Sequence, residues 1–132
     1  MNANRLYHWQ DKTILIVEDD LSSSFHLKEV LEDTGVYLLF ATDGHQAVEM
    51  VRDHPEINLV LMDIQMPIMN GYEATKKIKH FRPELTVIAQ TAYAFTKDRD
   101  LCFEAGCDAY LAKPIQPKEL LDRVAEFMNH QP

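Results

Sequence analysis

Several polar side chains stand directly after short apolar runs of this sequence, where strands would end. They are Glu18, Asp19, Asp20, Asp63, Thr91 and Lys113. Carboxylates that crowd together repel one another unless a cation neutralises them or their pKa values rise. A hydroxyl and an ammonium group beside such a cluster are suited to contacting phosphoryl oxygens. This combination of residue types therefore indicates a divalent cation site that also handles phosphate.

Oxygen ligands without a nearby histidine or cysteine favour Mg²⁺, which binds one or two carboxylates and keeps several waters. We predict that Asp19 and Asp63 are direct ligands. Glu18 is expected to act through water, and the backbone carbonyl of Gln65 to complete the protein's share. With Mg²⁺ and Lys113 withdrawing negative charge, the Asp63 carboxylate can attack phosphorus and form an aspartyl phosphate. No general base is needed, because a carboxylate is already ionised at neutral pH.

The apolar pattern alternates along the chain between short continuous runs and residues at helical spacing. This alternation predicts strands that alternate with helices around a parallel sheet. The expected strands are residues 13–17, 37–41, 59–62, 85–90 and 109–111. Helices are expected after each strand, with Gly35 closing the first, Asp43 capping the second and Pro117 in the first turn of the last.

Strict alternation of this length predicts an α/β fold, a doubly wound five-stranded parallel sheet with helices on both faces. In a flavodoxin-like sheet of strand order 2-1-3-4-5, ligands bind at the carboxyl ends of strands one and three. The acidic run from Glu18 and the side chain of Asp63 would meet there. Thr91 and Lys113 follow strands four and five, so they would lie on the other side of Asp63. Asp20 alone could equally be only a helix cap.

The composition limits the classes of partner. Thirteen Lys and Arg against twenty-one Asp and Glu give a net charge of −8, which disfavours direct contact with nucleic acid or anionic lipid. No apolar run is long enough to span a membrane. The two cysteines, Cys102 and Cys107, lack a metal-ligand motif and are expected to be reduced structural thiols of a cytosolic protein.

The sequence resembles the receiver domains of response regulators from Lys12 to about Met128. Five segments carry the resemblance: ILIVEDD at residues 14–20, LMDIQMP at 61–67, NGYEA at 70–74, Thr91-Ala92 and Lys113-Pro114. The resemblance assigns residues 12–129 to the receiver domain. Residues 1–11 are then expected to be a leader or linker, and residues 130–132 a tail.

Further expectations rest on the resemblance alone. It implies that Asp63 is phosphorylated by a histidine kinase or a histidine phosphotransfer protein, and that Glu18 and Asp19 form the metal pocket. It also implies that Thr91 and Tyr110 are switch residues that respond to the phosphoryl group, although Tyr110 could be only a packing residue. An isolated receiver is not an enzyme in its own right. The residues around Asp63 resemble those in receivers of hybrid sensor histidine kinases, which would place the domain on the cytoplasmic side of the membrane. Whether phosphorylation drives dimerisation stays open.

Three other functions compete with a phosphorylated receiver. A receiver that no longer accepts phosphate could serve only for docking, but the intact set of site residues argues against it. A Mg²⁺-dependent phosphatase with an aspartyl phosphate needs a second Asp two residues after the nucleophile, and Gln65 stands there. A flavodoxin-like flavin or nucleotide binder would need backbone amides and hydroxyls after strand one, where Glu18 and its neighbours would repel phosphate.

Overall fold

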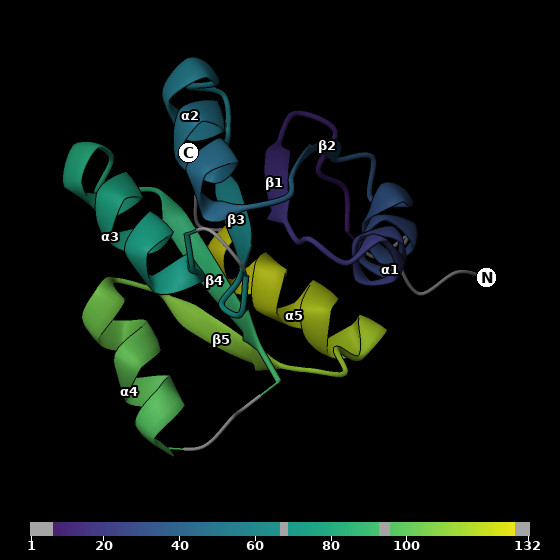
Figure 1. Cartoon of the computed structure of the whole chain (residues 1–132). Helices are drawn as coiled ribbons and strands as arrows, with labels where there is room; N and C mark the ends of the chain where they lie inside the picture. Colours follow the sequence, from purple (N-terminus) through teal and green to yellow (C-terminus); the bar gives the residue numbers. More distant parts are fainter. Residues whose placement is uncertain (1–6, 67–68, 93–95, 129–132) are drawn as a thin grey trace.

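The computed structural model describes residues 7–66, 69–92 and 96–128, so Pro67 and the expected tail lie outside the described residues. Strands and helices alternate along it in the expected order (Figure 1). The elements are β1 (Thr13–Val17), α1 (Leu21–Glu32), β2 (Tyr37–Ala41), α2 (Gly44–Asp53), β3 (Leu59–Asp63), α3 (Gly71–Phe81), β4 (Thr86–Thr91), α4 (Thr96–Ala105), β5 (Ala109–Ala112) and α5 (Pro117–Met128). None of the helices in the described part of the chain is both long and apolar enough to cross a membrane.

The strands form one parallel sheet in the order β2-β1-β3-β4-β5, which confirms the predicted fold class. β1 pairs with both β2 and β3, so the strand order reverses between β1 and β3. Within that pair, Val17 lies opposite Met62. The residues that come next, Glu18 and Asp63, therefore reach the carboxyl edge of the sheet side by side.

The three central strands, β1, β3 and β4, are buried on both sides, and apolar side chains pack on both faces of the sheet. α1 and α5 cover one face, where the core includes Leu27, Leu31 and Leu120. α2, α3 and α4 cover the other, as Figure 1 shows. Cys102 and Cys107 belong to this second core as buried thiols that are not joined in a disulfide. The resulting scaffold holds the carboxyl edge of the sheet in a fixed position.

Local signals explain where the elements begin and end. Asp20 caps α1, as its carboxylate accepts hydrogen bonds from the backbone and hydroxyl of Ser23. Asp43 caps α2 as expected. Gly35 has a φ of 80°, which glycine adopts without steric cost, and it turns the chain from α1 toward β2. β3 and β4 each extend one residue further than predicted, so Asp63 and Thr91 are the last residues of their strands.

The segment before β1 is packed against the domain. Trp9 is buried in the core between the sheet, α1 and α5, and its backbone N–H donates to the carbonyl of Thr34. The Tyr7 ring stacks on Trp9 with ring centroids 5.1 Å apart, and its hydroxyl donates to Asp122 in α5. The domain boundary at residue 12 stays a prediction, but the folded core already includes side chains from residue 7 onward.

Replacing Trp9 with alanine is expected to destabilise the protein by about 3–5 kcal/mol, because a large buried ring leaves a cavity that the core cannot fill. Urea unfolding would measure the change. His8→Ala is the matched control, since the neighbouring His8 side chain is exposed, and it should leave the free energy of unfolding nearly unchanged. A loss below about 1 kcal/mol for Trp9→Ala would mean that this segment contributes little to the folded core.

Candidate functional site

Asp63 lies at the end of the central strand β3 and is 2% exposed. The start of α3 packs closely against it, because residue 71 is a glycine. A Cβ at Gly71 would press against the carbonyl oxygen of Asp63 and lie 2.9 Å from the Cα of Ile64. The Gly71 N–H also donates to the carbonyl of Ile64. Gly71 thus lets the start of α3 pack against the backbone at the end of β3.

Three carboxylates meet at the carboxyl edge of the sheet. Glu18, Asp19 and Asp63 each offer an oxygen atom, and these atoms all lie within 4.8 Å of one another. Glu18 and Asp63 are buried, whereas Asp19 is exposed. A donor set made only of oxygen, with one side open to water, fits a hard cation such as Mg²⁺. The structure thus brings together the acidic residues that the sequence predicted.

Lys113 supplies the positive charge of this cluster. Its Nζ lies 2.9 Å from Glu18 Oε1 and 3.5 Å from Asp63 Oδ1. The backbone of Lys113 is fixed by its N–H, which donates to the carbonyl of Thr91, and the peptide bond to Pro114 is cis. Glu18 also accepts a hydrogen bond from the backbone N–H of Asp20. One ammonium group is therefore shared by two buried carboxylates.

This sharing leaves Asp63 short of positive charge. Burial first, and then the hydrogen bond and negative charge of Glu18, raise the pKa of Asp63 to about 7, against the opposing effects of Lys113 and the Gln65 backbone. Burial lowers the pKa of Lys113, but the hydrogen bond to Glu18 and the charges of both carboxylates raise it overall. Lys113 stays charged, while Asp63 resists ionisation unless further positive charge arrives. The expectation of a carboxylate fully ionised at neutral pH is therefore not met in the metal-free protein.

Gln65 links Asp63 to Thr91. Its backbone N–H donates to Asp63 Oδ1 at 3.2 Å, and its side-chain amide donates to the Thr91 hydroxyl at 3.2 Å. The Gln65 side-chain oxygen Oε1 accepts from the backbone N–H of Ala92. Thr91 is buried at the end of β4, where the sequence placed it. Tyr110 is half-buried in β5, pairs in register with Ala89, and packs edge-on against Phe103.

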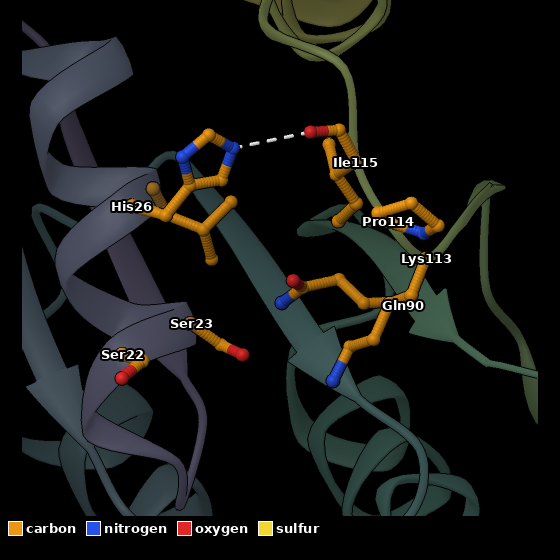
Figure 2. Close-up of a pocket in the computed structure, with 8 residues that line it drawn as sticks. Ser22, Ser23, His26, Gln90, Lys113, Pro114 and Ile115 are labelled. Carbon is orange, nitrogen blue, oxygen red and sulfur yellow. Dashed lines mark hydrogen bonds between the residues drawn. The ribbon is translucent and has the colours of Figure 1, made fainter.

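Two features of this region were not predicted from the sequence. The first is the side-chain link from Gln65 to Thr91, which no spacing rule reveals. The second is Gln90, a polar residue that interrupts the apolar run of β4 and could have been noticed for that reason. The Gln90 amide nitrogen is buried and has no hydrogen-bond partner among the described residues. It points into a cavity of about 470 Å³ between α1 and the loop after β5, which also borders Lys113 (Figure 2).

Comparison with known proteins places these residues in a family. The sequence matches the response regulator receiver domain over residues 14–125. It is 31% identical over 119 residues to the polar-differentiation response regulator DivK of Brucella ovis, covering 89% of this chain and 96% of that protein. It is 36% identical over 110 residues to a probable transcriptional regulator, ycf29, of Pyropia yezoensis. The match covers 82% of this chain and only 49% of that relative, so this chain spans about half the length of the relative.

Solved structures give the same result. The receiver domain of sensor histidine kinase PA1611 from Pseudomonas aeruginosa, with a magnesium ion in its active-site cleft, superposes with a TM-score of 0.82 and 32% identity, covering 89% of this chain and 98% of that one. The Saccharomyces cerevisiae receiver domain of Ssk1, crystallised with the histidine phosphotransfer protein Ypd1, has a TM-score of 0.84 and 26% identity, with coverages of 89% and 88%.

Asp63→Asn is expected to stabilise the metal-free protein at pH 8 by roughly 2–4 kcal/mol, and to have little effect near pH 4. The reason is that the folded pKa of Asp63, about 7, exceeds the ordinary value of 3.8. The wild type therefore loses stability as pH rises between these values, and asparagine does not. Urea unfolding with chelator across this pH range would measure the difference.

The matched control for this series is Asp53→Asn, because Asp53 is an exposed carboxylate at the end of α2. Its effect should be small and nearly independent of pH. A destabilising effect of Asp63→Asn at pH 8 would contradict the view that the ionised Asp63 carboxylate is under electrostatic strain in the absence of metal.

Proposed function

The chain belongs to the family of response regulator receiver domains, which act in two-component phosphorelay signalling, and we propose that Asp63 is the residue on which it accepts the phosphoryl group. The observation that carries the proposal is a buried carboxylate at the carboxyl edge of the sheet, between Glu18 and Lys113, with a raised pKa. A carboxylate that lacks positive charge in the metal-free protein is well placed to bind a cation, which together with Lys113 would offset the charge of a phosphoryl group.

The donor is proposed to be a phosphohistidine of a histidine kinase or a histidine phosphotransfer protein. A structural neighbour of 26% identity was crystallised with a phosphotransfer protein, which supports this class of partner. An ionised Asp63 oxygen attacks the phosphorus atom, the phosphorus–nitrogen bond breaks, and the imidazole nitrogen keeps the bonding electrons. Lys113, 3.5 Å from Asp63 Oδ1, stabilises the negative charge that the phosphoryl oxygens bring.

Asp19 and Asp63 are proposed as direct ligands of Mg²⁺, with Glu18 acting through water and the Gln65 backbone carbonyl as a further ligand. The three clustered carboxylates, and the magnesium ion in the cleft of a neighbour of 32% identity, support this assignment. When bound, Mg²⁺ would neutralise carboxylate and phosphoryl charge. Residue 65 is a glutamine and not a second acid, so we propose no turnover of small phosphorylated substrates.

The phosphoryl group is proposed to change the structure through Thr91 and Tyr110. In the resting state the Thr91 hydroxyl accepts a hydrogen bond from Gln65. A phosphoryl group on Asp63 adds strong acceptor oxygens, to which the Thr91 hydroxyl can donate once the Gln65 bond is released. Movement of Thr91 would open space behind β4 into which Tyr110 can turn. Gln65 therefore acts as a restraint on the resting position of Thr91.

The phosphoacceptor assignment is tested by intact mass after incubation with acetyl phosphate and Mg²⁺, with and without chelator. We expect one added phosphoryl group in the wild type, because the carboxylate cluster supplies both nucleophile and metal ligands. Chelator and Asp63→Asn should each abolish it, and the exposed control Asp53→Asn should keep it. Phosphorylation of Asp63→Asn to the wild-type level, or failure of the wild type with both acetyl phosphate and a phosphohistidine donor, would refute the assignment.

Thr91→Ala is expected to uncouple the switch from the site, because the methyl group cannot donate a hydrogen bond to a phosphoryl oxygen. Backbone NMR shifts of residues 109–112 would report the change when beryllofluoride and Mg²⁺ are added as a phosphoryl mimic. The wild type should show clear shifts there, and Thr91→Ala much smaller ones. Thr86→Ala, at the other end of β4, is the matched control. Full shifts in Thr91→Ala would exclude the proposed route.

A further inference from the structure

A group of basic side chains gathers between α2 and α3, on a protein whose net charge is −8. Arg52, Lys76, Lys77 and His80 line a shallow hollow of about 350 Å³, and no acidic residue lines it. The Arg52 guanidinium lies 5.0 Å from the centre of the Phe81 ring, which fixes it across the gap between the two helices. We call this surface the basic hollow.

The Arg52, Lys76 and Lys77 side chains of the basic hollow form no ion pair within the described residues. Several other cations are paired locally, such as Lys79 with Asp108, Lys118 with Asp122 and Arg123 with Glu126. A basic residue in the last turn of a helix interacts favourably with the helix dipole and stabilises the helix. Arg52 and His80 stand at such positions, which gives them a structural role. Lys76 and Lys77 stand in the middle of α3, where the dipole gives no such reason.

The basic hollow is remote from the phosphoacceptor site. α2 and α3 both start near the carboxyl edge of the sheet, where Gly71 contacts Asp63, and run away from it (Figure 1). Arg52 and His80 are in the last turns of these helices, roughly 13 Å along the helix axes from their first residues. A molecule bound in the basic hollow would therefore leave Asp63 accessible to a phosphodonor.

We propose that the basic hollow is a docking site for a short acidic segment of a partner protein. Its concave shape and its unneutralised cations complement a few clustered carboxylates. An extended polyanion such as a membrane surface or nucleic acid suits it less, because exposed carboxylates at Glu49, Asp53 and Glu73 lie on the same two helices. The site goes beyond the phosphoacceptor function and does not depend on it. It would hold a partner while Asp63 exchanges phosphate.

The test is an NMR titration of the full chain with a synthetic hexaglutamate peptide. Chemical-shift changes are expected to centre on the second half of α2 and on α3. Affinity should fall clearly as salt rises from about 50 to about 300 mM, because exposed charges are screened. The double variant Lys76→Gln/Lys77→Gln should weaken binding at least about fivefold, a change of about 1 kcal/mol. Both lysines are exposed, so the variant should fold as the wild type does.

The control is Lys97→Gln/Lys118→Gln, which removes the same charge from α4 and α5 and should bind the peptide nearly as the wild type does. Equal weakening by both double variants would mean a general charge effect and would overturn the proposal. Shift changes elsewhere would also overturn it. So would tighter binding of inorganic tripolyphosphate or of phosphatidylserine vesicles through Lys76 and Lys77, since the ligand would then be a phosphate compound or a membrane.

Discussion

The structure depends on one electrostatic constraint, the burial of two carboxylates beside a single ammonium group. Glu18 and Asp63 come from adjacent strands, and Lys113 bonds the first more closely than the second, at 2.9 Å against 3.5 Å. Asp63 is left with a raised pKa and a need for positive charge. A site in this state costs folding stability, and proteins keep such costs where function requires them.

The surrounding fold serves this constraint. The reversal of strand order between β1 and β3 sets Glu18 beside Asp63, and Gly71 allows the start of α3 to pack against the backbone at the end of β3. Gln65 connects the same carboxylate to Thr91 at the end of β4 through two hydrogen bonds. The sheet holds Asp63 and Thr91 at the ends of β3 and β4. Basic side chains on α2 and α3 then extend the binding surface away from the site.

Much of this arrangement follows from the sequence, because alternation of apolar patterns fixes parallel strands and parallel strands gather their carboxyl ends. That logic placed Glu18, Asp63 and Lys113 together without coordinates. It could not predict that Lys113 favours Glu18, since strand spacing says nothing about side-chain distances. It did not anticipate Trp9 in the core either, because no periodic pattern precedes β1. The Gln65 bond and the cations of the basic hollow depend on tertiary packing, which local patterns do not encode.

Calorimetric titration of Mg²⁺ in buffers of different ionisation enthalpy tests the central claim most directly. Mg²⁺ should displace a proton from Asp63 at about pH 6, where the carboxyl is largely protonated, and almost none at about pH 8.5. Asp63→Asn should abolish the proton release at about pH 6. Binding that releases the same number of protons at both pH values, or no Mg²⁺ binding at all, would contradict the account.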